Sequence, residues 1–167
     1  MGISEHIIHP IAPVYDKHSR VLILGTLPSP ASRAVGFYYG HKQNMFWPLL
    51  AGLFGEPTPA DVAARKAFAL RHHIALWDVL KEGDIMGAAD SSIKNAVVND
   101  FAPIFKLADI QAVFCTGKTA LKYYNEFAFL KTQKAAIYLP STSPANRAAQ
   151  MKPEFMAAWR RILDFSA

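Results

Sequence analysis

The sequence predicts an α/β fold, a three-layer α/β/α sandwich in which helices cover both faces of a short, mainly parallel, four-stranded sheet. Short apolar runs alternate along the chain with segments of amphipathic, helical periodicity, as in repeated βα units. The clearest run, residues 21–24, is continuous and branched, which is typical of a strand buried on both faces of a parallel sheet. The 167 residues, 51% of them hydrophobic, are enough for a single domain, residues 1–167, with a full core.

The remaining elements follow the first strand in order along the chain. Further strands are predicted over residues 74–78, 112–116 and 135–139. Helices are predicted over residues 46–54, over 60–71 with a start at Thr58-Pro59, over 102–107, after Gly117, and over 154–165. Residues 81–95 are polar and contain glycine, so we expect a loop there. Right-handed crossovers between the strands then give the three layers.

Two turns rich in proline and serine each follow a predicted strand. Residues 25–29 read Gly-Thr-Leu-Pro-Ser, and residues 139–144 read Leu-Pro-Ser-Thr-Ser-Pro. Ligands of open α/β sheets bind at the carboxyl ends of the strands, where backbone N–H groups can point at phosphates or oxyanions. Because both turns lie at such ends, the sequence predicts that they share one site.

An aromatic stretch, residues 36–47, separates the first turn from its helix. It contains Tyr38 and Tyr39, a histidine, and the amides of Gln43 and Asn44. Aromatic faces stack on any base, and amides can read a base edge or hold a water molecule. These residues therefore predict a site for a flat ligand.

No pattern in the sequence is typical of a metal site or a disulfide. The single cysteine, Cys115, falls in an apolar run, where a small buried thiol is expected. The six histidines lack the HExxH spacing of helical zinc sites. We therefore expect no metal, no other cofactor and no disulfide within the chain.

Charge and hydropathy give expectations for the cellular location and for the kind of binding partner. Residues 1–9 are too polar for a signal peptide, and no apolar segment is long enough to span a bilayer. We therefore expect a cytoplasmic protein without membrane contact. The net charge of +5 favours a polyanionic partner without requiring one.

Taken together, these motifs resemble the uracil-DNA glycosylase superfamily, most closely the branch named for hypoxanthine-DNA (deoxyinosine) glycosylase activity. The resemblance spans nearly the whole chain. Its carriers are residues 25–29, 38–41, 44–47, 77–80 and 141–146. Each motif alone is weak, but jointly and in this order they are specific.

The resemblance implies that Asn44 is the main catalytic residue. Many members have a water-activating Asp or Asn soon after the glycine of the first motif, where this chain has Thr26 and Leu27. In the branch that the chain resembles, this role belongs to the Asn of an Asn-x-Phe-Trp string, here Asn44, whose carbonyl oxygen would orient the water. Ser141, the second expected catalytic residue, stands where several relatives have a base-stabilising His. This departure argues against strong uracil activity.

The resemblance also implies a base pocket and a DNA-binding surface. The target base must leave the duplex to enter a pocket. Ala145 stands where relatives wedge a larger residue into the base stack, so either Asn146 or Arg147 is expected to enter the duplex. The pocket residues are expected to be Gly25, Thr26, Leu27, Pro28, Tyr38, Tyr39, Phe46 and Trp77. The DNA contacts are expected from Ser29, His41, Ser143, Pro144, Ala145, Asn146 and Arg147.

The leading hypothesis is a monomeric, monofunctional DNA glycosylase that hydrolyses the N-glycosidic bond of a deaminated base in DNA, hypoxanthine first and uracil or xanthine second. No lysine is placed to act as an amine nucleophile. Three alternatives stay open: a uracil- or mismatch-specific glycosylase, a non-catalytic lesion-binding module on the same fold, and an unrelated nucleotide-binding domain. The last is weakest, because no phosphate-binding glycine motif follows the first strand. Asn44 also stands where a helix N-cap is expected, and Asp78 is expected to make a structural hydrogen bond to a neighbouring loop.

Overall fold

A parallel sheet of four strands forms the centre of the computed structural model, which describes residues 3–166. Its strands are β2 (Val21–Gly25), β3 (Ile74–Asp78), β6 (Ala112–Thr116) and β7 (Ala136–Leu139), in the order β3-β2-β6-β7. All three pairings are parallel. The sheet and its layers confirm the predicted fold class.

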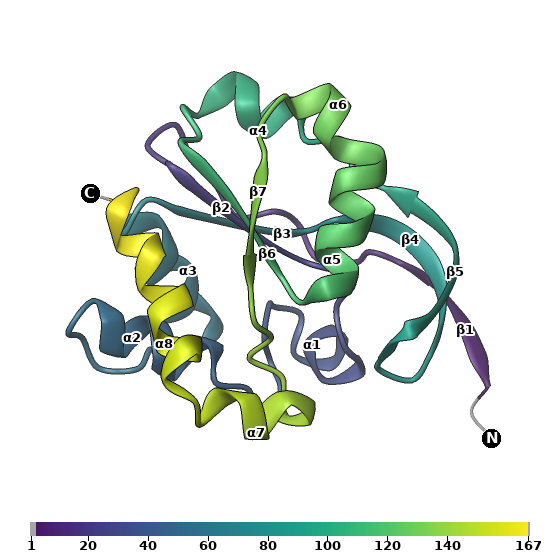
Figure 1. Cartoon of the computed structure of the whole chain (residues 1–167), viewed down its shortest axis with the longest axis horizontal. Helices are drawn as coiled ribbons and strands as arrows, with labels where there is room; N and C mark the ends of the chain where they lie inside the picture. The colour runs from purple at the N-terminus through teal and green to yellow at the C-terminus, as the bar shows by residue number, and fades with distance from the viewer. Residues whose placement is uncertain (1–2, 167) are drawn as a thin grey trace.

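Helices cover both faces of this sheet (Figure 1). On one face lie α2 (Phe46–Leu53), α3 (Val62–Arg71) and α8 (Pro153–Arg160), and on the other lie α4 (Ala102–Leu107), α5 (Lys118–Tyr123) and α6 (Phe129–Thr132). The short helices α1 (Pro30–Val35) and α7 (Arg147–Gln150) belong to the loops after β2 and β7. A π-helical turn, Tyr124–Ala128, joins α5 to α6, and 3₁₀ turns cover Pro144–Asn146 and Arg161–Asp164.

The central strand β2 divides the core into two clusters. Val21 and Ile23 pack into one cluster, and Leu22 and Leu24 pack into the other. All four side chains have no exposed surface, because successive residues of a strand face opposite sides and both sides are covered here. The continuous apolar run was therefore a reliable sign of a doubly buried strand.

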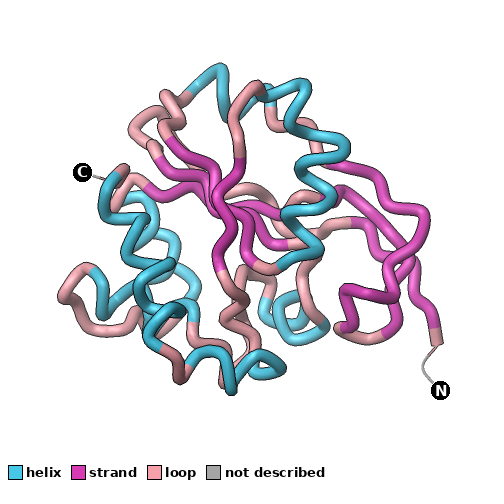
Figure 2. The backbone as a smooth tube through the Cα atoms, in the orientation of Figure 1, coloured by secondary structure: helices cyan, strands magenta, loops and turns pink. Residues whose placement is uncertain are grey.

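The prediction of a loop over residues 81–95 was wrong. This region forms β4 (Leu80–Met86) and β5 (Ala89–Val98), which pair with β1 (Ser4–Ile8) in a second, antiparallel sheet of order β1-β4-β5 (Figure 2). Ile85 and Ile93 point into the core while most other side chains face solvent. A strand with one solvated face carries many polar residues, so polarity alone did not distinguish it from a loop.

Several helix ends also differ from the prediction. The helix expected from residue 60 begins at Val62, because Asp61 Oδ1 accepts a hydrogen bond from Ala64 N at 2.7 Å and acts as its N-cap. The closing helix ends at Arg160 and continues as a 3₁₀ turn. None of the helices in residues 3–166 has the length and apolar content that crossing a membrane requires.

Candidate active site

A cleft of about 590 Å³ opens at the carboxyl ends of the parallel strands. Its lining comes from the loops after β2, β3, β6 and β7, from the aromatic loop before α2, and from the tip of the β4–β5 hairpin. The two Pro-Ser turns meet there, as the sequence predicted. The predicted residues on the lining are Gly25, Thr26, Leu27, Pro28, Ser29, Tyr38, Tyr39, His41, Asn44, Ser141, Ser143, Pro144, Ala145 and Asn146.

Three predicted residues lie away from the cleft. Phe46 has no exposed surface and packs beneath Tyr39, with ring centroids 3.7 Å apart and planes within 9° of parallel. Trp77 packs edge-on against Phe101, 5.6 Å between centroids. Arg147 is exposed and donates a hydrogen bond to Gln43 O at 3.0 Å. As placed here, Phe46 and Trp77 do not wall the pocket; Phe46 instead supports Tyr39 from below.

Asn44 lies on the cleft and also bonds to the first residue of a helix, although the N-cap position itself is Met45 and not Asn44 as expected. Its Oδ1 accepts a hydrogen bond from Phe46 N at 2.9 Å, in the first turn of α2. This contact assigns the carbonyl oxygen to the side that faces the helix and leaves it one lone pair for a second donor. The next residue, Met45, donates from its N–H to Thr142 O at 3.1 Å, which joins this loop to the second Pro-Ser turn. The Asn44 side chain can therefore accept the Phe46 N–H and still accept a second hydrogen bond in the cleft.

The two tyrosines of the aromatic loop have different partners. Tyr38 is 2% exposed, and its hydroxyl donates to Ala12 O at 2.9 Å. Tyr39 has φ +56°, a left-handed conformation that is uncommon outside glycine, and its buried hydroxyl has no hydrogen-bond partner within residues 3–166. Burial, with the charge of Asp78, raises the pKa of Tyr39, and the nearby Thr116 hydroxyl lowers it in part. Tyr39 therefore stays a neutral hydrogen-bond donor at the cleft.

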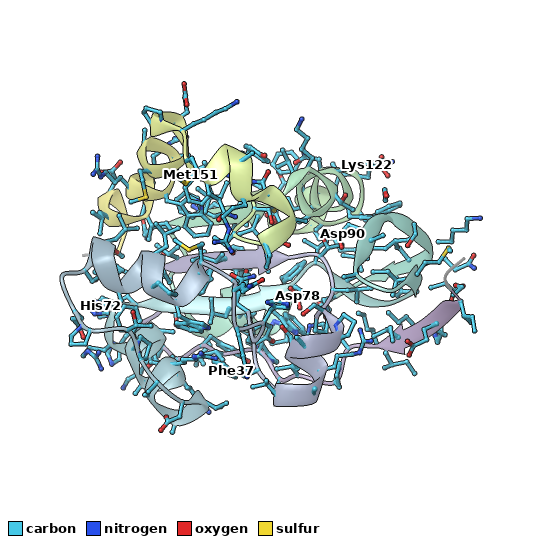
Figure 3. All side chains as sticks on the ribbon, turned by 90° about the horizontal axis from the view of Figure 1, so that it is seen from below. Phe37, His72, Asp78, Asp90, Lys122 and Met151 are labelled. Atoms are coloured by element: carbon cyan, nitrogen blue, oxygen red, sulfur yellow. The ribbon has the colours of Figure 1, made fainter. Side chains whose placement is uncertain are left out.

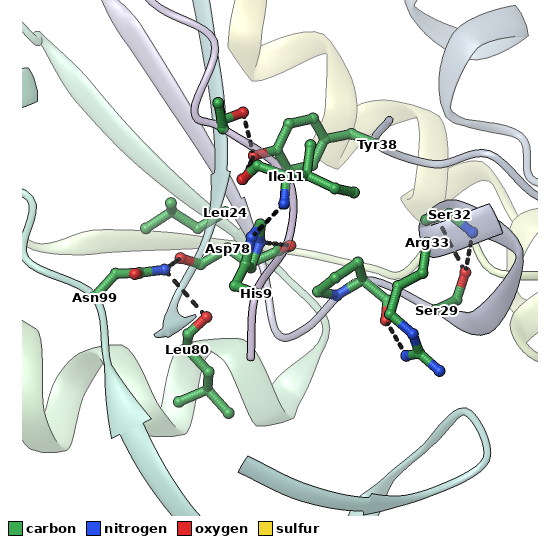
Figure 4. A network of polar contacts seen from close by, with 12 residues as sticks. His9, Ile11, Leu24, Ser29, Ser32, Arg33, Tyr38, Asp78, Leu80 and Asn99 are labelled. Carbon is green, nitrogen blue, oxygen red and sulfur yellow. Dashed lines mark hydrogen bonds and ion pairs between the residues drawn. The ribbon is translucent and has the colours of Figure 1, made fainter. Parts of the chain in front are cut away.

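A buried His9–Asp78 pair lies behind the end of β2 (Figure 4). Asp78 Oδ2 accepts from His9 Nε2 at 2.7 Å, and the side chains are 6% and 3% exposed. His9 Nδ1 accepts from Ile11 N at 3.3 Å, which assigns the ring proton to Nε2. The other oxygen, Oδ1, lies 2.6 Å from where a Cβ at Gly25 would stand. Asp78 thus makes the expected structural hydrogen bond, and its position requires glycine in the first motif.

The second Pro-Ser turn is braced by side chains that follow it. Asn146 Nδ2 donates to Ser141 O at 2.9 Å, and Gln150 Nε2 donates to Ser143 O at 2.8 Å. The hydroxyl oxygens of Ser141 and Ser143 accept local N–H groups, at 3.1 and 3.3 Å. Ala145 is exposed at the tip of the turn. The loop is therefore preorganised, and its serine hydroxyls retain their own protons for donation.

Sequence reasoning missed several residues of the lining. Thr116, Gly117, Lys118 and Tyr138 line the cleft from the ends of β6 and β7. The strand-end argument used for the Pro-Ser turns would have found the first three, since they end or directly follow the strand predicted at residues 112–116. Asp90 of β5 also lines the cleft, near the floor formed by Asp78 (Figure 3). Its position on the cleft was missed because residues 81–95 were predicted to form a loop and not the β4–β5 hairpin.

No group of three or more His, Cys, Asp or Glu side chains in residues 3–166 is arranged to hold a metal ion. Cys115 is buried on β6, and burial raises the pKa of its thiol to about 12. A thiol with such a pKa is not a nucleophile near neutral pH.

Comparison with known proteins shows which family the chain is similar to. Residues 12–163 match the model of the uracil DNA glycosylase superfamily. A protein named hypoxanthine DNA glycosylase from Methanosarcina barkeri is 37% identical over 113 residues, 66% of this chain and 72% of that protein. Its namesake from Methanosarcina acetivorans is 35% identical over 136 residues, 80% of this chain and 85% of that protein.

A solved structure shares the fold. The solution NMR structure of a candidate uracil DNA glycosylase from Methanosarcina acetivorans has a TM-score of 0.77 and 29% identity to this chain. The match covers 93% of this chain and 98% of that one. The likeness therefore extends over most of the architecture.

Proposed function

The chain belongs to the uracil DNA glycosylase superfamily, and on this basis we propose that it is a monofunctional DNA glycosylase that removes hypoxanthine from DNA. One observation carries the proposal: Asn44 and both Pro-Ser turns meet on a single cleft at the carboxyl edge of the sheet. The cleft volume of about 590 Å³ lies within the range of small-molecule sites and is sufficient for a flipped base. The names of the two curated relatives support hypoxanthine as the base.

In this mechanism Asn44 positions water and the loops stabilise charge. The free lone pair of Asn44 Oδ1 accepts from a water molecule directed at C1′ of the flipped nucleotide. The glycosidic bond breaks as the sugar gains oxocarbenium character, so the water need only be placed correctly. Backbone N–H groups of residues 25–29, with the neutral hydroxyl of Tyr39, stabilise negative charge on the departing base.

A lyase step is not part of the proposal. Lys42 and Lys118 are both exposed, so neither amine is desolvated as Schiff-base catalysis requires. Hydrolysis therefore leaves an intact abasic strand that alkali can break.

The proposed DNA surface surrounds the mouth of the cleft. Ser29 and Ser143 supply hydroxyls for phosphates, and Lys118 adds a positive charge at the rim. Exposed Ala145 directly follows the second turn, at the position where the family resemblance implies an inserted wedge, and exposed Arg147 begins α7 just beyond it. A monomeric state and a cytoplasmic location stay predictions.

Base release from end-labelled duplexes tests the proposal. Duplexes with one deoxyinosine, deoxyuridine or deoxyxanthosine are incubated with protein and then treated with alkali. We expect cleavage at deoxyinosine only after alkali, and a loss of about 100-fold or more in the single-turnover rate of Asn44→Ala. Asn44→Asp retains the acceptor for Phe46 N–H and controls for loss of the cap.

Other outcomes point to specific alternatives. If Asn44→Ala matches the wild-type rate, Asn44 has no part in the chemistry. If deoxyuridine is the better substrate, the chain is a uracil-specific member of the superfamily. Tight lesion binding without any base release would favour the non-catalytic module.

A further inference from the structure

Asp90 is a carboxylate on the cleft that the proposed mechanism does not use. It stands near the start of β5, directly after the hairpin turn, and its side chain is half-buried. None of the ion pairs within residues 3–166 involves Asp90. A partly desolvated carboxylate without a cation is costly unless a ligand or water supplies hydrogen-bond donors.

Thr26 is a second polar residue in this part of the cleft. It is 4% exposed, and its buried Oγ1 has no hydrogen-bond partner in the described part of the chain. Its hydroxyl lies within reach of the Asp90 carboxyl: burial and the charge of Asp78 raise the pKa of Asp90, and hydrogen bonding from Thr26 lowers it. An acceptor on β5 and a hydroxyl donor in the loop after β2 thus stand together on the lining of the cleft.

This pair matches the edge that deamination creates on a base. Hypoxanthine presents an N1–H donor beside the C6 carbonyl acceptor, and uracil presents the same pattern at N3–H and C4. Adenine presents the reverse, an N1 lone pair beside an amino donor. A carboxylate next to the adenine lone pair leaves two acceptors facing each other, an arrangement that buried sites reject strongly.

We propose that Asp90 and Thr26 read this edge: Asp90 accepts from N1–H of hypoxanthine, and Thr26 donates to O6. The proposal rests on the proposed function and deepens it, because it assigns the class of base and the residues that select it. Guanine has the same edge, but its stable pairing makes extrusion more costly than for a mispaired, deaminated base.

The experiment compares two bases in three proteins. Deoxynebularine has the purine ring of deoxyinosine without N1–H and without O6. Single-turnover rates are measured on duplexes with either base for the wild type, Asp90→Asn and Thr26→Val. We expect the wild-type preference for deoxyinosine to fall at least about tenfold in each variant, since Asp90→Asn replaces the charged acceptor with a neutral amide and Thr26→Val removes the donor to O6. The rate on deoxyinosine is divided by the rate on deoxynebularine for each protein, and the wild-type value is then divided by that of the variant. This double ratio removes any intrinsic difference between the two glycosidic bonds.

Two controls separate base reading from folding and charge. Asp109→Asn removes the same charge from an exposed position that is not on the cleft, and its preference should equal that of the wild type. Thr26→Val keeps the shape and removes one buried hydroxyl that makes no hydrogen bond of normal geometry in the described part of the chain, so its unfolding temperature should stay close to that of the wild type. A preference for deoxyinosine that is unchanged in both cleft variants overturns the proposal.

Failure of the proposed function is a separate outcome. If the wild type releases neither base, the glycosylase assignment fails, and base reading is then measured as binding of the same two duplexes by fluorescence anisotropy. Tighter binding of deoxyinosine that Asp90→Asn abolishes supports base reading in a protein without turnover. Equal binding of both duplexes by the wild type overturns it.

Discussion

Replacing Gly25 with alanine tests the packing at the floor of the cleft. The new Cβ would lie 2.6 Å from Asp78 Oδ1, closer than real Cβ contacts come. The backbone cannot retreat easily, because Gly25 is paired with Asp78 across β2 and β3 and Val79 N donates to Gly25 O at 2.8 Å. The strain must therefore be relieved by the Asp78 side chain, which is bound to His9 at 2.7 Å.

The expected cost has two limits. If the neighbours shift while the pair persists, overpacking costs about 1–3 kcal/mol. If Asp78 rotates away and breaks the buried pair, the cost rises to about 3–5 kcal/mol. For a chain of this size each kcal/mol lowers the unfolding temperature by about 2–4 °C, so Gly25→Ala should lower it by about 2–20 °C.

Calorimetry or circular dichroism measures this change, with Gly52→Ala as the matched control. No atom lies within 4 Å of a Cβ at Gly52, which is in α2, so the same substitution should stabilise by up to about 1 kcal/mol. In an Asp78→Ala background, Gly25→Ala should cost much less, because the clashing oxygen is gone. Equal costs in the two backgrounds would refute the clash as the cause.

Three further predictions concern titration and buried polar groups. Hydrogen bonds that the His6 imidazole donates to Asp84 and Glu82 raise the pKa of His6, so its contribution to β1 docking is present below about pH 6.5 and is lost as pH rises through the higher folded value. Thermal melts across this pH range should show a smaller decline in stability for His6→Gln, and equal declines would contradict this. Tyr39→Phe removes a buried hydroxyl without a partner in residues 3–166, so the unfolding temperature should stay level or rise; a loss above about 1 kcal/mol would reveal a hidden partner. Cys115, with its raised pKa of about 12, should resist a thiol reagent near pH 8 until the protein is unfolded; rapid native labelling would show that β6 opens.

Local sequence determined the parallel sheet and the place of the cleft. Continuous apolar runs identify strands buried on both faces, and such strands end at one common edge, so the two Pro-Ser turns were expected to meet. The helix that begins at Phe46 was predicted for the same local reason, and so was the hydrogen bond between Asn44 and the first turn. These features depend on neighbours in the chain, which the sequence displays directly.

Long-range pairing decided the details of the cleft. His9 and Asp78 are 69 positions apart, and nothing in either local pattern predicts their contact. Phe46 and Tyr39 were both expected in the pocket, but stacking leaves Tyr39 on the lining and Phe46 in the core. Asp90 reached the cleft through a hairpin whose solvated face has the composition of a loop. Sequence patterns report how each residue suits its local environment, whereas the packing of β5 against the carboxyl edge of another sheet is set by the whole core.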